Sequence, residues 1–215
     1  MGSISPQQQR ERFIAQYVIQ PPVALYDIGV GPKTEWEELP KLWPNMKVYG
    51  CEPHPAIYRE LLRRHFPGPL WPVAISSQAS VVLHTYRNQV RRNLLGSSSI
   101  FGLPDMDGDP ITARAWTLDA FDDACERPTG ILLWMDIEGG ELDALQSGIR
   151  LLQSGRVHYI NLEVRRRPPV AGWPTAQDLN SFLKSLGYAK ACDYLHCGDH
   201  WDVIYLRAPV QPWPP

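Results

Sequence analysis

The stretch ILLWMDIEGGELDAL, residues 131–145, carries the strongest fold signal in the chain. Its first five residues are apolar, with the length and composition of a buried strand. The run ends at Asp136, and two glycines and then leucines at helical spacing follow. A buried strand that ends in a carboxylate and leads into a helix is typical of a parallel sheet covered by helices.

Short apolar segments that end in an acid recur along the chain. They are VALYDIG (23–29), KVYGCEP (47–53) and VHYINLEV (157–164). Helical patterns stand between them, and the last pair of segments, YAKACDYL and WDVIYLR, is typical of an antiparallel hairpin. We therefore predict an α/β fold, doubly wound, with a mostly parallel sheet and a C-terminal antiparallel hairpin.

Other segments give local expectations. EWEELPKLW (35–43) predicts a helix broken near Pro40, and LWPVAIS (70–76) predicts one strand. GGELDALQSGIRLL (139–152) predicts one helix, and TAQDLNSFLKSLG (175–187) predicts a helix capped by Thr175 and stopped by Gly187. Residues 87–112 are rich in Gly, Ser, Asp and Pro without a clear period, which predicts a long loop or cover segment.

The composition sets broad limits. The chain has 215 residues, 44% of them hydrophobic and 20% charged, with a formal net charge of −2. We predict a single domain over residues 1–215, with an N-terminal helix and lead-in over residues 1–22 and a loose tail over residues 208–215. No global charge attracts the chain to nucleic acid or to a membrane surface. The sequence leaves the oligomeric state open.

The chain shows no targeting or membrane signal. The opening MGSISPQQQRERF lacks the apolar core of a signal peptide, and no apolar run approaches the roughly 18 residues that span a bilayer. The four cysteines form no CxxC pair and are too sparse for a disulfide framework. We therefore expect a cytoplasmic protein with reduced thiols.

Four acids, Asp27, Glu52, Asp136 and Glu163, each end a predicted strand. Parallel strands end at one edge of a sheet, and ligands of open α/β sheets bind outside the carboxyl ends of the strands. We therefore expect these four side chains to gather along one rim, where chemistry can take place.

The first two acids favour a nucleotide cofactor. Gly29 and Gly31 lie in the predicted turn after the first strand, where glycine lets the backbone approach a ligand. Glu52, at the end of the next strand, can accept hydrogen bonds from ribose hydroxyls. A dinucleotide fingerprint would need a third glycine where Thr34 stands, and Asp27 would repel a pyrophosphate. The positive charges of S-adenosylmethionine fit this site better than NAD does.

The order of several motifs resembles a known family, the FkbM-type methyltransferases, over about residues 23–207. The motifs are YDIGVGP, VYGCEPHP, PVAIS, SSSIFG, WTLDAF, WMDIEGGE and INLEV. The resemblance implies an S-adenosylmethionine-dependent enzyme with the seven-stranded class I methyltransferase fold, acting by O-methylation on a small hydroxylated acceptor such as a sugar or natural product. It also implies roles for individual residues: Asp27, Gly29 and Gly31 at the methionine end of the cofactor, Glu52 at the ribose, and Ala74 and Ile75 beside the adenine.

The chain departs from this family pattern at two places. Members often carry a further glycine near position 33, where this chain has Pro32 and Lys33. They usually have lysine before the Asp of DIEGGE, where this chain has Met135. The second change removes a positive charge near the predicted site, so the substrate or the rate can differ from those of relatives.

Asp136 and Glu163 are the candidate catalytic residues. Methyl transfer to oxygen requires the acceptor to lie about 3 Å from the methyl group and to lose its proton. Either carboxylate can act as the general base. Together with Glu138 they can instead hold a divalent metal that lowers the pKa of the acceptor hydroxyl. Glu138 and Glu141 also have a structural explanation, as acids at the start of the next helix.

Candidate substrate contacts are Glu138, Arg165 and His200. The run RRR (165–167) follows Glu163 and would attract an anionic acceptor, unless it is a solvated basic loop. His200 belongs to a CxxxHCxxH segment whose spacing does not match a zinc site, although one of its histidines can project over the substrate.

Two alternatives to O-methylation remain open. One is an N-methyltransferase, which needs less help from a base. The other is a non-catalytic, methyltransferase-like binding domain, against which the intact set of Asp27, Gly29, Gly31 and Glu52 argues.

Overall fold

A computed structural model describes residues 16–32, 35–86, 98–197 and 200–208, with the side chains of residues 194–200 left out. Most of the predicted N-terminal helix, residues 1–15, lies outside the described residues, and residues 16–22 form turns and bends. The part of the predicted tail from residue 209 onward also lies outside them. Among the residues that the structure describes, no helix has the length and apolar character needed to cross a membrane.

Seven strands form the main sheet, in the order β3-β2-β1-β7-β8-β10-β9. Their bounds are β3 Leu70–Trp71, β2 Lys47–Cys51, β1 Ala24–Ile28, β7 Ile131–Met135, β8 Val157–Arg165, β10 His200–Arg207 and β9 Tyr188–Cys197. Strands β3, β2, β1, β7 and β8 each pair in parallel with their neighbour in this order. Strand β10 pairs antiparallel with both β8 and β9. The predicted mostly parallel sheet with a C-terminal hairpin is confirmed.

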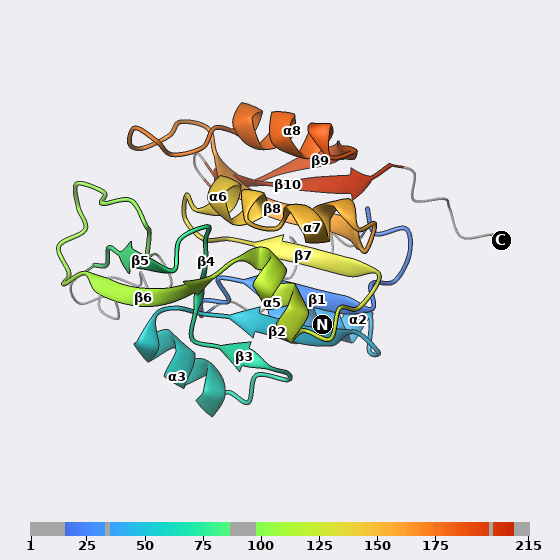
Figure 1. The fold of residues 1–215 in the computed structure, drawn as a ribbon, viewed down its shortest axis with the longest axis horizontal. Coiled ribbons are helices and arrows are strands. Elements are labelled where there is room, and N and C mark those ends of the chain that lie inside the picture. The colour runs from blue at the N-terminus through green and yellow to red at the C-terminus, as the bar shows by residue number, and fades with distance from the viewer. Residues whose placement is uncertain (1–15, 33–34, 87–97, 198–199, 209–215) are drawn as a thin grey trace, which may run out of the picture.

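A second, three-stranded sheet lies beside the main one (Figure 1), with the order β4-β6-β5. It consists of β4 (Ala74–Ile75), β6 (Ile111–Trp116) and β5 (Ser80–Leu83). The prediction of one strand over residues 70–76 is therefore wrong. Pro72 separates β3 from β4, because proline has no N–H to donate to a ladder. Of the predicted cover segment, residues 98–110 are irregular, and residues 111–112 already belong to β6.

Helices cover both faces of the main sheet. One face packs against α2 (Glu35–Leu42) and α3 (Pro55–Arg63). The other packs against α5 (Leu118–Ala124), α6 (Glu141–Gln146), α7 (Ile149–Gln153) and α8 (Ala176–Ser185). Alternate strand residues serve the two cores: Tyr26 and Leu133 face the α5–α8 side, while Leu25 and Trp134 face the α2–α3 side.

Two helix predictions need correction. Helix α2 continues through Pro40, because the bond that proline removes lies near the end of a short helix whose Trp36 and Leu39 are buried. The predicted helix over residues 139–152 is two helices, α6 and α7, separated at Ser147 and Gly148. A side chain at Gly148 would lie 2.6 Å from Leu118, so the glycine between the two helices allows α5 to pack closely.

Helix α8 follows the prediction. Thr175 caps it in a capping box with Asp178, and Gly187 follows its end with a φ of +84°.

Candidate functional site

The turn after β1 packs directly against the end of β7. Asp136 N–H donates to the carbonyl of Ile28 at 3.2 Å. Gly29 has a φ of +78°, and a Cβ there would lie 2.6 Å from the carbonyl oxygen of Asp136. Only glycine combines this backbone conformation with so close an approach. The turn at residues 27–29 and the DIEGG turn at residues 136–140 are therefore in direct contact at the carboxyl edge of the sheet.

Glu52 links the turns after β1 and β2. Gly31 N–H donates to Glu52 Oε2 at 2.9 Å, and His54 N–H donates to Glu52 Oε1 at 2.7 Å. His54 in turn caps α3 by accepting from Ala56 N–H at its Nδ1. The carboxylate is buried, at 5% exposure, and both of its oxygens are oriented by backbone donors. A carboxylate oxygen has two lone pairs, so a carboxylate oriented in this way is suited to bind ligand hydroxyls.

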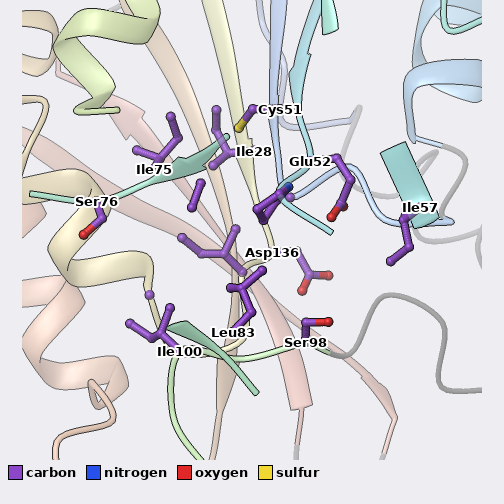
Figure 2. A pocket seen from close by; sticks show the side chains of 15 residues that line it. Ile28, Cys51, Glu52, Ile57, Ile75, Ser76, Leu83, Ser98, Ile100 and Asp136 are labelled. Carbon is purple, nitrogen blue, oxygen red and sulfur yellow. The ribbon is translucent and has the colours of Figure 1, made fainter. Parts of the chain in front are cut away.

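A cavity opens at the carboxyl ends of β1, β2 and β7. It is lined by Ile28, Gly29, Cys51, Glu52, Pro53, Ile57, Ala74, Ile75, Ser76, Leu83, Ser98, Ile100, Asp136, Ile137 and Gly140. Figure 2 shows Ile28 and Cys51 on one side of it, Leu83 and Ile100 on the opposite side, and Asp136 between them. Most of the wall is apolar, with few polar groups, as is usual for sites that bind small molecules.

The cavity brings together five of the predicted site residues: Gly29, Glu52, Ala74, Ile75 and Asp136. Asp27 and Gly31 are not among its lining residues. Asp27 is buried in β1 at 2% exposure, and the N–H of Gly31 binds Glu52. Their predicted contacts with the methionine end of a cofactor stay predictions.

Several lining residues were not predicted. Ile57 comes from α3, Ser76 follows β4, Leu83 ends β5, and Ser98 and Ile100 belong to the irregular segment after residue 97. Sequence periodicity does not reveal Ser76, Ser98 and Ile100, because irregular segments have no period. Ile57 and Leu83 lie in a helix and a strand, but nothing local in the sequence shows that they face this cavity. The motif SSSIFG, residues 97–102, was the available signal, although no role could be assigned to its residues.

The segment 98–101 forms a wall with two sides. Ser98 and Ile100 line the cavity. Ser99 donates from its Oγ to the carbonyl oxygen of Glu138 at 2.6 Å, and Phe101 packs against Trp173 with ring centroids 5.4 Å apart. This alternation places one side of the wall at the cavity and the other at the DIEGG turn.

Three acids converge beside the cavity. Asp136, Glu138 and Glu163 place carboxylate oxygens that all lie within 4.8 Å of one another. Asp136 follows β7 and Glu163 lies near the end of β8, and these neighbouring strands pair Met135 with Leu162. The prediction that the two strand-end acids lie on adjacent strands is therefore confirmed.

Glu138 has a backbone conformation unusual for its residue type, with a φ of +50°. Two contacts hold it. Its carbonyl accepts the Ser99 bond, and its carboxylate accepts from Arg165 Nη2 at 2.8 Å. Arg165 also lies over the Trp173 ring, 5.1 Å from its centroid. Strained residues cluster at functional sites, where the surrounding contacts maintain them.

Arg165 therefore neutralises part of the acidic cluster, and its predicted contact with a substrate stays a prediction. The backbone of His200 pairs with Arg165 in the β8–β10 ladder. The side chain of His200 lies outside the described residues, so its predicted role is not tested.

Glu141 has a structural role. Its carboxylate accepts from Ile137 N–H at 3.1 Å and from Gly139 N–H at 3.1 Å, which fixes the turn between β7 and α6. Burial, with a smaller contribution from the nearby Glu138, raises the pKa of Glu141 to about 7, against the lowering effect of these backbone donors. The side chain is 3% exposed.

Comparison with known proteins gives a family and a fold. The profile of the methyltransferase FkbM domain matches residues 27–190. No curated protein sequence matches the chain. Similar solved structures include magnesium protoporphyrin IX methyltransferase from Synechocystis PCC 6803 with bound S-adenosylmethionine, at 9% identity and a TM-score of 0.50, covering 97% of this chain and 86% of that one.

Two other structures resemble the chain to a similar degree. An S-adenosylmethionine-dependent methyltransferase from Aquifex aeolicus has 11% identity and a TM-score of 0.51, covering 95% of this chain and 99% of that one. Aeropyrum pernix fibrillarin with bound S-adenosylmethionine has 13% identity and a TM-score of 0.51, covering 94% of this chain and 76% of that one. At these identities the likeness establishes the fold.

Proposed function

The chain belongs to the FkbM methyltransferase domain family, and from this premise we propose that it transfers a methyl group from S-adenosylmethionine to a hydroxyl oxygen of a small acceptor, such as a sugar or natural product. One observation carries the proposal. A single cavity at the carboxyl ends of the strands joins the Gly29 turn and the Glu52 carboxylate to Asp136.

The residues of the cavity fit the parts of this cofactor. Glu52, oriented by two backbone donors, would accept hydrogen bonds from the ribose hydroxyls. Ala74 and Ile75 offer an apolar surface for the adenine, and Gly29 lets the backbone approach the methionine end. When bound, S-adenosylmethionine supplies a methyl group made electrophilic by the sulfonium.

The acid cluster would serve the acceptor. Asp136 borders the cavity, and Glu163 lies beside it at the end of the neighbouring strand. Either carboxylate would take the proton from the acceptor hydroxyl as the oxygen attacks the methyl carbon. A positioned general base typically contributes about 10²- to 10⁴-fold to the rate.

A divalent metal is a second possible use of the same acids. Asp136 and Glu163 are oxygen donors of the kind that Mg²⁺ prefers, and one or two carboxylates with waters suffice for it. Glu138 is less suited, because its carboxylate already binds Arg165. Methyl transfer measured after treatment with EDTA, with and without added MgCl₂, tests this. A loss that Mg²⁺ restores would support the metal, and full activity in EDTA would exclude it.

Parallel calorimetric titrations with S-adenosylmethionine and NAD test the proposal. We expect binding of S-adenosylmethionine and none of NAD. Tight NAD binding without binding of S-adenosylmethionine would contradict the proposed methyltransferase function of this cavity. A screen of hydroxylated and amine acceptors, scored by release of S-adenosylhomocysteine, then separates O-methylation from N-methylation. Binding without turnover on any acceptor would favour a non-catalytic binding domain.

A further inference from the structure

Asp143 joins helix α6 to the loop after β4. Its Oδ2 accepts from Ser76 Oγ at 2.6 Å and from Ser77 N–H at 3.0 Å, and its Oδ1 accepts from Ser77 Oγ at 2.5 Å. Three donors from two consecutive residues thus converge on one carboxylate. The positions are 66 and 67 residues apart in the sequence, so this is a tertiary contact between separate parts of the fold.

The two parts that Asp143 joins belong to different regions of the cavity. Ser76 lines the cavity and follows Ala74 and Ile75, which also line it. Helix α6 begins at Glu141, immediately after the DIEGG turn that carries Asp136. The main sheet does not itself include β4, which pairs with β6 in the small sheet. The Asp143 contact therefore fixes the wall formed by residues 74–76 relative to the turn beside β1 and β7.

Ser76 is held from several directions. Its N–H donates to the carbonyl of Trp116 at 2.9 Å, and its Oγ accepts from Gln78 N–H at 3.1 Å while donating to Asp143. The residue is buried, at 3% exposure. Because the Ser76 hydroxyl donates its proton to Asp143, it is not available to donate to a ligand, and Ser76 serves as a fixed part of the cavity wall. Asp143 is the charged member of this network.

Asp143 is ionised at neutral pH. Burial alone would raise its pKa, but the hydrogen bonds from Ser76 and Ser77 outweigh this and lower the pKa below its ordinary value. Hydrogen bonds to a charged acceptor are stronger than those between neutral groups. The hydrogen bonds from Ser76 and Ser77 to the ionised Asp143 are therefore stronger than the same bonds to a neutral acceptor would be.

We propose that Asp143 is a positioning residue for cofactor binding, which holds the adenine-side wall of residues 74–76 at the correct distance from the Gly29 and Asp136 turns. The inference rests on the proposed function, because it takes this cavity as the site of S-adenosylmethionine. Asp143 does not line the cavity, and it would act through Ser76 and Ser77.

Calorimetric titration of wild type and Asp143→Ala with S-adenosylmethionine and with 5′-methylthioadenosine tests the proposal. The second ligand keeps the adenine and ribose but lacks the amino-acid end. We expect the variant to lose about tenfold in affinity for both ligands, because the wall of residues 74–76 loses all three hydrogen bonds that tie it to α6. Asp123→Ala is the matched control, because Asp123 binds Arg150 on the exposed side of α5. It should bind both ligands as the wild type does.

A second variant keeps the test decisive if Asp143→Ala does not fold. Ser77 is exposed and does not line the cavity, and its Oγ donates to Asp143 and accepts from the side chain of Gln78. Asp143 is the partner that connects Ser77 to helix α6, so we expect Ser77→Ala to affect binding through Asp143. We expect Ser77→Ala to weaken binding severalfold in the wild-type background. In the Asp143→Ala background, where that variant folds, Ser77→Ala should have no further effect.

The failures are distinguishable. A wild-type protein that binds neither ligand overturns the proposed function. A wild-type protein that binds, with both Asp143→Ala and Ser77→Ala binding equally well, overturns only the role of Asp143. A loss for S-adenosylmethionine with unchanged affinity for 5′-methylthioadenosine would place the effect at the methionine end, which also contradicts the proposal.

Discussion

Glu52 shows how one side chain can organise a binding site. It cannot be replaced by an amide without cost, because both oxygens accept backbone N–H groups, from Gly31 and His54. A glutamine would turn its NH₂ group toward one of these donors. The carboxylate is therefore needed both to orient the two turns and to receive the ribose hydroxyls that we propose.

We expect Glu52→Gln to weaken S-adenosylmethionine binding by about 10- to 100-fold, since hydrogen bonds to charged groups contribute roughly 1.5–3 kcal/mol each. Calorimetric titration measures the change. Glu60→Gln is the matched control, because Glu60 pairs with Arg63 on the exposed side of α3, away from the cavity. Equal affinity in Glu52→Gln and wild type would remove Glu52 from the cofactor site.

The two strand-end acids should separate binding from chemistry. We expect Asp136→Asn and Glu163→Gln to keep most of their affinity for S-adenosylmethionine. The variant that lacks the general base should lose about a hundredfold in turnover, because proton removal from the acceptor fails. Release of S-adenosylhomocysteine with an acceptor found by screening measures the rate. Undiminished turnover in both variants would show that neither carboxylate takes part.

At the scale of the elements, the contact between the β1–α2 turn and the end of β7 depends on Gly29. Gly155 provides an unusually good comparison, because its φ of +82° is close to the +78° of Gly29, while a Cβ there would meet nothing within 4 Å. The two glycines thus separate the cost of left-handed backbone from the cost of crowding.

We expect Gly155→Ala to lose about 1–2 kcal/mol of stability, the cost of left-handed backbone in a residue with a Cβ, and to bind S-adenosylmethionine normally. Gly29→Ala should lose more stability and should also bind poorly, because its Cβ would push against the Asp136 carbonyl. Urea denaturation and calorimetry measure the two effects. If both variants behaved alike, the close approach at Gly29 would not matter.

How far the elements could be predicted depended on local chemistry. Strands β1, β2, β7 and β8 were predictable because each is an apolar run of strand length with an acid at or near its end. The Thr175 cap was predictable because capping is a contact between residues close in sequence. These features need no knowledge of the rest of the chain.

Other features depend on tertiary contacts and were missed. Nothing local in LWPVAIS shows that β4 pairs with β6 rather than with the main sheet. Between α6 and α7, Gly148 leaves room for Leu118 of α5, and Asp119 caps α7 from that same helix α5 by accepting from Leu151 N–H at 2.8 Å. Ser98 and Ile100 line the cavity from an irregular segment, which has no sequence period, so they could not be predicted either.

At the scale of the whole molecule, Glu141 should make stability depend on pH. Its pKa rises from an ordinary value of 4.5 to about 7 in the folded protein, chiefly through burial. The folded state therefore holds this proton more tightly than the unfolded state does. The resulting stabilisation is fully present below pH 4.5 and is lost as the pH rises through about 7.

Comparison of wild type with Glu141→Gln isolates this effect, because glutamine keeps an acceptor for Gly139 N–H but does not titrate. We expect the stability of the wild type relative to the variant to fall by about 3 kcal/mol between pH 4.5 and pH 8, at 1.36 kcal/mol per pKa unit. Urea denaturation at several pH values in this range measures it. A difference that stays constant across the range would contradict the role of burial at Glu141.

The account as a whole depends on where the cofactor binds. A crystal structure of the protein with S-adenosylhomocysteine is the most direct measurement. We predict that the ribose will lie against Glu52, the adenine beside Ala74 and Ile75, and the sulfur on the Asp136 side of the cavity. Ligand density elsewhere on the molecule, with this cavity holding only solvent, would contradict the account.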